Sequence, residues 1–418
     1  MSRISTTVLG NGLPLHKLEL AGTRAATLLV AFDAGSRTER PEENGMAHFL
    51  EHLVFKGGEK YANYQAVNEA AESAGAVLNA YTSHDLVAFH ITARSTKLLD
   101  AADLLTDFVG RPRIDADELD KERGVVIQEI ARSEDQPAAL AEYLIDSAVF
   151  GSHPLGRRVL GTEEHLRSTF TREGIVEFRR RQWAAGSAAA FVVGNLEAVD
   201  DGALEGYFER FASGETPPPY EPAPALEPKF VVQERDSQQS HLRMSYRPAV
   251  DVTDPQQRAA LTIYSTLLGG SMGSRLFDEI REQRGLAYSV GSFPHAYADV
   301  GVLQLSAGLQ SDKAVEAYRR MRDVVSELRV DGPRPEEVER ARAFAAGARA
   351  IAFENTNAIA RHAAAQTIVF SQDFDPDAVI ERLDAVTYDQ VREVAAAIAD
   401  ELTVAVVGPH TVQEFEAA

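Results

Sequence analysis

The chain of 418 residues contains no cysteine. This absence excludes disulfides, thiolate nucleophiles and cysteine-based zinc sites, so any metal must be held by histidine, aspartate or glutamate. No apolar run approaches the roughly 18 residues of a membrane helix, and we expect no membrane contact. The N-terminus lacks a basic-then-apolar leader, which favours a cytoplasmic protein; a mature form with its leader removed would look the same.

Basic residues are scarce compared with acidic ones. There are 42 Lys and Arg against 63 Asp and Glu, which gives a net charge of -21. No basic run suggests a nucleic-acid-binding face, and the short cluster Arg179–Arg181 is typical of an exposed helix end. We therefore expect no nucleic-acid partner. An acidic protein attracts cationic partners, so the charge is compatible with basic peptides as ligands.

A proline-rich stretch, GETPPPYEPAPALEPK at 214–229, divides the sequence into two halves. A chain of this length is expected to form two or three domains, and proline-rich segments are extended and semi-rigid. The sequence therefore predicts a first domain over 1–213, a linker over 214–229 and a second domain over 230–418.

Both halves show the same order of patterns. The first contains strand-like ATLLVAFDAG, the alternating pair AVLNAYTS and LVAFHITA, two long helical patterns, and a closing strand SAAAFVVGNL. The second repeats this order with SHLRMSYRP, AYSVGSFPHA, GVLQLSAGL, two helical patterns and closing LTVAVVGP. Strands at hairpin spacing followed by helix pairs predict an α+β fold. We expect two homologous domains, each a mostly antiparallel sheet with helices packed on one face.

The segment GMAHFLEHLVFKG at 45–57 places His48, Glu51 and His52 in the order H-x-x-E-H. On a helix, residues four apart share a face, so the two imidazoles can bind one Zn²⁺. Glu51 would lie beside the metal, where a carboxylate can take a proton from activated water. Such residues also occur harmlessly on helix surfaces. Here they interrupt an apolar run, and the order is an inverted zinc-peptidase signature.

A third metal ligand must come from elsewhere. The helical pattern DELDKERGVVIQEIARSED places Glu122 and Glu129 seven residues apart, on one face after two turns. The flanking Ile127 and Ile130 make Glu129 the more inward of the two by pattern. Spacing alone leaves open whether either glutamate is a ligand or an ordinary solvated helix residue.

With GSRTERPEENGMAHFLEHLVFKG and these two glutamates, the sequence closely resembles the pitrilysin family of inverted-motif zinc peptidases, the family of insulin-degrading enzyme, in a short two-domain form. Further matches are LNAYTSHDLVAFH, HPLG, SRLFDEIREQRGLAYSV and the closing VVGP, so the resemblance covers essentially the whole chain. It implies a zinc metalloendopeptidase that hydrolyses unfolded peptides or short polypeptides.

The resemblance also implies roles for individual residues. His48, His52 and Glu129 would hold one Zn²⁺ per chain, since Glu129 follows His52 by the family's 77 residues. Glu51 would be the general base, and Glu122 would support the site from beside the ligands.

In the second half, the resemblance implies that Arg281 and Tyr288 contact the substrate backbone. Taken alone, this pair could equally be a salt-bridged helix arginine and a core tyrosine. In the first half, the alternation of LNAYTS predicts a strand whose edge pairs with an extended peptide. Asn79 would hold the substrate backbone there, and Ala80 would leave room for close approach.

The family's full active chamber needs four α+β units, and this chain has two. The resemblance therefore implies pairing with a second chain. A homodimer is expected because both kinds of half-site are present here; a heterodimer with a related chain is the other option.

Three other functions compete with a zinc peptidase, and a non-peptidase zinc hydrolase is one of them. A non-catalytic structural or partner subunit of the same fold is the alternative function. GGSMG at 269–273 matches a serine-hydrolase elbow, but that motif needs a preceding strand, and the sequence before Ser271 is helix-like.

Overall fold

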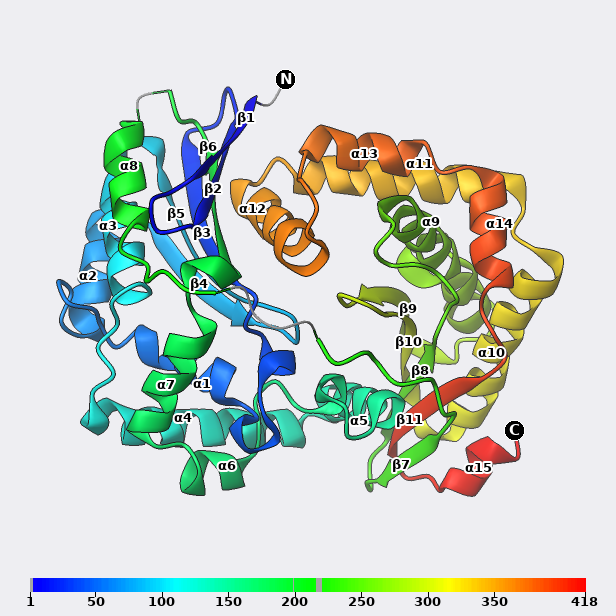
Figure 1. Cartoon of the computed structure of the whole chain (residues 1–418). Helices are drawn as coiled ribbons and strands as arrows, with labels where there is room; N and C mark the ends of the chain where they lie inside the picture. Colours follow the sequence, from blue (N-terminus) through cyan, green and yellow to red (C-terminus); the bar gives the residue numbers. More distant parts are fainter. Residues whose placement is uncertain (1–2, 198, 216–219) are drawn as a thin grey trace. The chain divides into compact units, whose positions relative to one another are not determined.

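The computed structural model describes residues 3–197, 199–215 and 220–418 (Figure 1). The chain forms two compact units, each made of several segments. Unit 1 contains residues 1–130, 158–221 and 351–377, and unit 2 contains 131–157, 222–350 and 378–418. Of the expected linker 214–229, residues 216–219 lie outside the described residues, and the remainder forms no helix or strand.

Unit 1 is built on a six-stranded sheet in the order β1-β2-β6-β3-β5-β4. Its strands are β1 Arg3–Val8, β2 Pro14–Glu19, β3 Ala25–Phe32, β4 Val77–Thr82, β5 Val87–Arg94 and β6 Ala188–Gly194. Only the β2–β6 pair among these strands is parallel. The order leaves β4 at one edge of the sheet, beyond β5.

Unit 2 repeats the arrangement with five strands in the order β7-β11-β8-β10-β9. They are β7 Phe230–Glu234, β8 Gln239–Tyr246, β9 Ala287–Ala296, β10 Gly301–Gln310 and β11 Leu402–Gly408. The β7–β11 pair is parallel and the other described pairs are antiparallel. The predicted α+β fold with two similar, mostly antiparallel sheets is confirmed.

A main layer of helices covers one face of each sheet. In unit 1 alternate residues of β3, such as Leu28, Val30 and Phe32, point into this layer, and Trp183 stacks on Phe32 with ring centroids 5.1 Å apart. The helices are α1 Met46–Val54, α2 Tyr64–Ser73, α3 Leu98–Phe108, α4 Ala116–Asp135, α6 Glu163–Ser168, α7 Arg172–Gln182 and α8 Asp201–Phe208.

The helical layer of unit 2 packs in the same way on residues such as Leu242, Met244 and Tyr246 of β8. It contains α9 Pro255–Ser265, α10 Ala314–Asp331, α11 Pro335–Ala352, α13 Pro376–Asp384, α14 Tyr388–Ala396 and α15 Val412–Glu416. Two π-helical turns, Thr266–Gly270 and Phe277–Glu282, follow α9. The GGSMG segment at 269–273 thus begins inside a helical turn, whereas a serine-hydrolase elbow follows a strand.

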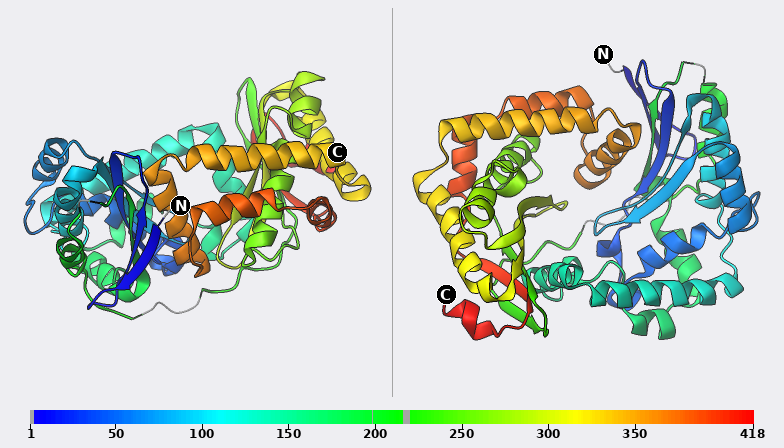
Figure 2. Two further views of the ribbon diagram at one scale, coloured as in Figure 1. Left: turned by 90° about the horizontal axis from the view of Figure 1, so that it is seen from above. Right: turned by 180° about the vertical axis from the view of Figure 1, so that it is seen from behind.

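Each sheet also carries one helix on its opposite face, and that helix comes from the other half of the sequence (Figures 1 and 2). Helix α12, Thr356–Ala364, packs on β3 and β6 of unit 1, while α5, Pro137–Phe150, packs on β8 and β11 of unit 2. The predictions of helices on one face and of contiguous domains 1–213 and 230–418 did not include this exchange. It explains why β6 and β11 are buried along their whole length.

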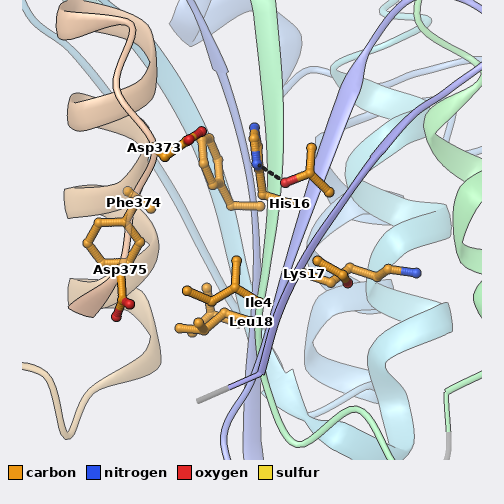
Figure 3. Close-up of a pocket in the computed structure, with 12 residues that line it drawn as sticks. Ile4, His16, Lys17, Leu18, Asp373, Phe374 and Asp375 are labelled. Atoms are coloured by element: carbon orange, nitrogen blue, oxygen red, sulfur yellow. Dashed lines mark hydrogen bonds between the residues drawn. The ribbon is translucent and has the colours of Figure 1, made fainter. Parts of the chain in front are cut away.

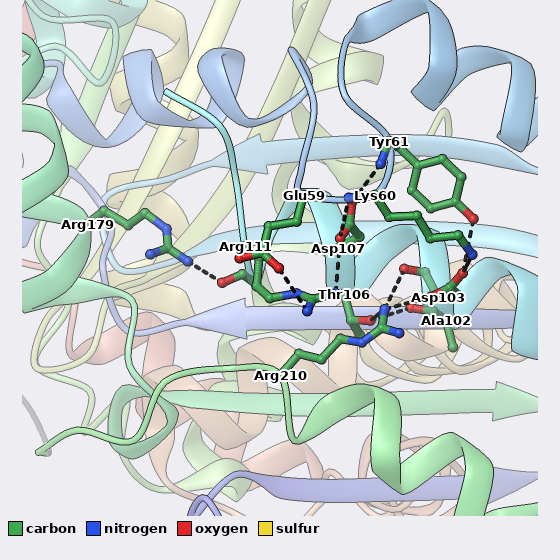
Figure 4. Close-up of polar contacts among 11 residues, drawn as sticks. Glu59, Lys60, Tyr61, Ala102, Asp103, Thr106, Asp107, Arg111, Arg179 and Arg210 are labelled. Atoms are coloured by element: carbon green, nitrogen blue, oxygen red, sulfur yellow. Dashed lines mark hydrogen bonds and ion pairs between the residues drawn. The ribbon is translucent and has the colours of Figure 1, made fainter. Parts of the chain in front are cut away.

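The loop after α1 is fastened to α3 by a buried carboxylate (Figure 4). Asp107 accepts hydrogen bonds from the backbone nitrogens of Lys60, at 2.9 Å, and Tyr61, at 3.0 Å, and from the Arg111 guanidinium at 3.2 Å. A Cβ on Gly58 would lie 2.7 Å from the Asp107 carbonyl oxygen, so only glycine allows this close approach.

None of the described helices is long and apolar enough to span a membrane.

Replacing Asp107 with alanine should destabilise unit 1, because it removes the buried carboxylate that accepts from the backbone N–H groups of Lys60 and Tyr61. The expected cost is roughly 2–4 kcal/mol, measured by denaturant unfolding. Asp107→Asn keeps one carbonyl acceptor and should lose less than half of this. Equal losses in the two variants would contradict the assigned contacts.

Candidate metal centre

The N-terminus of α1 is held by a buried carboxylate. Glu39 accepts hydrogen bonds from the backbone nitrogens of Gly45, at 2.9 Å, and Ala47, at 2.8 Å, and from the Asn44 amide at 3.2 Å. Gly45 has φ 96°, and a Cβ there would meet Gly161 at 2.6 Å. These contacts satisfy free N–H groups at the helix start and fix the position from which α1 enters the core.

Three side chains from α1 and α4 converge on one point. The Glu129 Oε2 atom lies 3.7 Å from His48 Nε2 and 3.5 Å from His52 Nε2. The two imidazole rings meet edge to face, with centroids 4.6 Å apart. The predicted grouping of His48, His52 and Glu129 is thus present in the structure.

The donor atoms fit a zinc ion. Tetrahedral ligands each about 2.0–2.2 Å from Zn²⁺ are separated by roughly 3.3–3.6 Å. The distances from Glu129 Oε2 to the two imidazole nitrogens, 3.7 and 3.5 Å, are close to this spacing. Among the described residues, His48, His52 and Glu129 form the group of histidines and carboxylates able to hold a metal ion. Two imidazoles and one carboxylate leave a fourth position open, as in catalytic zinc sites.

Glu122 orients His52. Its Oε1 atom lies 2.9 Å from His52 Nδ1, and its Oε2 atom contacts the Lys56 ammonium. When Nδ1–H donates to Glu122, the lone pair of Nε2 is directed at the metal position. Burial acts to raise the pKa of Glu122, but the contacts with His52 and Lys56 together outweigh it and lower this pKa. The predicted supporting role of Glu122 therefore has a defined contact.

The relative burial of the two glutamates is the reverse of the sequence prediction. The side chain of Glu122 is 7% exposed and that of Glu129 is 43% exposed. The flanking Ile130 is buried in the core, but Glu129 lies at the solvent side of the histidines. A metal ligand at an open site must be reachable from solvent. The apolar neighbours of Glu129 therefore led to the wrong prediction of which glutamate is more buried.

The surroundings shift the pKa values of the two histidines in opposite directions. Burial, reinforced by neighbouring His52, lowers the pKa of His48 to about 4. Burial also acts to lower the pKa of His52, but hydrogen bonds with Glu122 and Glu129 outweigh it and raise this pKa to about 9. Because a histidine that binds a metal must be deprotonated at the binding nitrogen, a cation competes with a proton at His52.

Glu51 lies beside the metal ligands without belonging to their group. The Glu51 Oε2 atom accepts a hydrogen bond of 2.6 Å from Thr82 Oγ1, at the end of β4. Burial raises the pKa of Glu51, and the Thr82 bond and the nearby His52 only partly oppose this. A carboxylate so placed holds a proton more readily than one in water, as a general base near neutral pH requires.

Strand β4 connects Glu51 to a free sheet edge. Leu78 and Ala80 pack against the core of unit 1, while Asn79 is exposed. The Asn79 side chain accepts a hydrogen bond of 2.9 Å from Ala80 N, an edge donor that an added strand would use. A peptide that pairs with this edge would have to displace the bond, so the Asn79 side chain competes with an added strand for Ala80 N.

Arg281 and Tyr288 lie together in unit 2. The Arg281 guanidinium donates to the Tyr288 carbonyl at 3.1 Å and lies 5.7 Å from the centre of its ring. Tyr288, on β9, is 84% exposed. Tyr288 is therefore not a core residue. Arg281 does lie in a helical turn and has an ion-pair contact with Glu282, at 3.7 Å, so that half of the alternative interpretation holds.

The sequence did not predict roles for Glu39, Thr82 and Lys56. Glu39 holds the N-terminus of α1, Thr82 positions the Glu51 carboxylate, and Lys56 positions the Glu122 carboxylate. Glu39 and Lys56 lie in the quoted motif segments, but their roles depend on contacts distant in sequence. Thr82 shares the alternation of β4 with Leu78 and Ala80, which placed it on the same face.

A separate cavity of about 350 Å³ lies on the α12 face of the unit 1 sheet (Figure 3). Strands β1 and β2 contribute Ile4, His16 and Leu18, and the segment after α12 contributes Asp373 and Phe374. None of the three metal-binding candidates lines it, so it is distinct from the metal centre.

Two family models match the chain. Residues 18–163 match the insulinase domain of peptidase family M16, and residues 169–344 match the peptidase M16 inactive domain. An uncharacterized zinc protease of Streptomyces coelicolor is 30% identical over 402 residues, covering 94% of this chain and 86% of its own. Another from Bacillus subtilis is 29% identical, covering 89% and 90%.

Solved structures share the fold. The M16 inactive-domain protein of Pseudomonas fluorescens aligns with a TM-score of 0.89 at 20% identity, covering 98% of this chain and 99% of its own. A protease from Helicobacter pylori aligns with the same TM-score at 21% identity, covering 98% and 100%.

The zinc content of purified variants should distinguish the metal ligands from Glu122, which orients one of them. We expect one Zn²⁺ per chain in the wild type and none in His52→Ala. Glu122→Gln should retain zinc but bind it about 10–100-fold more weakly, because only the orientation of His52 is lost. Stoichiometric, tightly bound zinc in His52→Ala would rule out the assigned site.

Proposed function

The chain belongs to the M16 family of peptidases, and on this premise we propose that it is a zinc metalloendopeptidase acting on unfolded peptides or short polypeptides. One observation carries the proposal. Glu51 is held between the candidate metal ligands and the end of the edge strand β4. This arrangement can bring a base, a metal and an extended peptide to one place.

His48, His52 and Glu129 would hold the zinc ion. When bound, Zn²⁺ would supply Lewis acidity, which lowers the pKa of water and polarises a carbonyl group. Glu51 accepts the proton of the attacking water and passes it to the leaving amine, so its raised pKa suits both steps. Thr82 keeps the carboxylate in position through its hydrogen bond.

We propose that the substrate adds to the free edge of β4 as an extra strand. The backbone donors and acceptors of this edge would pair with the peptide, once Asn79 releases Ala80 N. Ala80 presents only a methyl group, which allows close approach. Such pairing selects extended chains and rejects stably folded ones.

In unit 2, Arg281 and Tyr288 would contact the substrate backbone. Arg281 is already held over the Tyr288 ring, so its donors are presented with limited freedom. Guanidinium donors can bind peptide carbonyls, and an exposed tyrosine offers both a hydroxyl and an apolar face.

The variant Glu51→Gln tests the base directly. It keeps size and can still accept a hydrogen bond from Thr82, but it cannot take a proton. Cleavage of an unfolded reporter peptide should fall by roughly 10²–10⁴-fold while zinc content stays at the wild-type level. Loss of zinc in this variant would make Glu51 a ligand and overturn its role.

The same assay addresses the alternative, a non-catalytic structural or partner subunit. Wild-type protein that holds stoichiometric zinc but cleaves no unfolded peptide would support that alternative and contradict the peptidase.

We further propose that two copies of this chain pair, with a heterodimer as the competing arrangement. Each copy carries both the metal ligands and the Arg281–Tyr288 pair, so self-pairing supplies every group. Two-fold homodimers are also the commonest assembly.

Mixing two defective variants tests this pairing. Glu51→Gln lacks the base, and Arg281→Ala/Tyr288→Phe lacks the second contact. If pairing lets one copy complement the other, the mixture should be more active than either parent. An active monomer by light scattering, or activity equal to the parents' average, would contradict the homodimer.

A further inference from the structure

Helix α12 is anchored on the sheet face that carries Asn79 and Tyr81. Thr27 Oγ1 on β3 lies 2.8 Å from Thr356 Oγ1 at the start of α12 and 2.8 Å from Thr92 Oγ1 on β5. The register pairs Thr92 with Val77 and therefore puts Thr92, His90 and Tyr81 on one face. This contact places the later turn of α12 beside the edge of the sheet.

Arg361, in that later turn, lies over β4. Its guanidinium carbon is 4.3 Å from the centre of the Tyr81 ring. Burial, with a smaller contribution from the charge of Arg361, lowers the pKa of the neighbouring His90 to about 4, so His90 is a neutral imidazole. Arg361 is exposed, and among the described residues no carboxylate pairs with it. A cation is therefore held at the free edge without a counter-charge.

Strand pairing defines which substrate side chain would meet this cation. Residues directly opposite each other in paired strands point to the same face, with Cβ atoms about 4.5–5.5 Å apart. In a peptide added to β4, the residue opposite Tyr81 would thus point to the α12 face. Its neighbours would point to the other face, where Thr82 holds Glu51.

We propose that Arg361 is a specificity-determining residue that favours an aspartate or glutamate side chain at the substrate position opposite Tyr81. The inference rests on the proposed peptidase function and adds its substrate class. A guanidinium presents paired donors that match a carboxylate, and stacking on Tyr81 limits the freedom that binding must remove. Because the site is solvent-exposed, the preference should be modest, about five- to tenfold in kcat/KM.

A purely structural role makes a different prediction. Arg361 lies on α12, and its contact with Tyr81 helps to hold α12 on the sheet. If that were its whole role, substitution would lower stability and cleavage of all peptides alike. Only a specificity role changes the ranking of substrates at one position.

The test uses the zinc-loaded full-length protein and a positional library of quenched, unfolded peptides with amidated C-termini. Wild type should prefer Asp and Glu over Gln, and Gln over Lys, at one position near the cleaved bond. Arg361→Gln should flatten this preference, Arg361→Glu should reverse it towards Lys, and Arg361→Lys should keep part of it. Arg180→Glu, on α7, makes the same charge change elsewhere and should leave the ranking unchanged.

Zinc content and thermal unfolding of each variant control for damage to the fold, and Arg361→Gln serves if the charge reversal does not fold. An acidic preference that persists in Arg361→Gln, or that is absent from wild type, would overturn the inference while leaving the peptidase intact. The library is also prepared with free C-terminal acids, and an acidic preference seen only with those peptides would assign Arg361 to a chain end and overturn the side-chain assignment. Failure of wild type to cleave any peptide would instead overturn the proposed function.

Discussion

The hydrogen bond between His52 and Glu122 is the contact on which the candidate site depends. It joins α1 to α4 and determines which nitrogen of His52 faces the metal position. Because Glu122 and Glu129 lie seven residues apart on α4, the same helix face both orients one ligand and supplies another. A rotation of α4 would disturb both functions together. Lys56 further reduces the freedom of Glu122, because its ammonium contacts the second carboxylate oxygen.

The exchange of α5 and α12 between the two halves of the sequence buries the second face of each sheet. Each sheet would expose apolar residues on one face if only its own half of the sequence folded around it, as with Val407 of β11 and Phe191 of β6. A helix from the other half covers these residues, which makes the two halves mutually dependent for burial. It also brings Arg361, from late in the sequence, to the strand that lies beside Glu51. The exchange therefore shapes the candidate substrate edge as well as the core.

The sequence predicted those features that local spacing controls. His48 and His52 four apart, strands at hairpin spacing and the repeated order of elements led directly to the metal pair and the two sheets. Glu129 needed the family resemblance, because spacing alone left its role open and its flanking isoleucines suggested the wrong burial. Glu39, Thr82 and the exchange of helices could not be predicted, since each depends on packing between segments far apart in the chain. Local periodicity carries no information about which helix covers a second sheet face.

The charge of the whole chain and the charge at the edge strand act over different distances. A net charge of -21 attracts cationic peptides during approach, but at physiological ionic strength this attraction is screened beyond about 8 Å. Once a peptide lies along β4, the guanidinium of Arg361, held over the Tyr81 ring, is a fixed charge on the α12 face. Attraction at long range and selection at the site can then favour different residues of one substrate. A peptide with a basic flank and an acidic residue opposite Tyr81 would satisfy both, because the first speeds encounter while the second stabilises the bound strand.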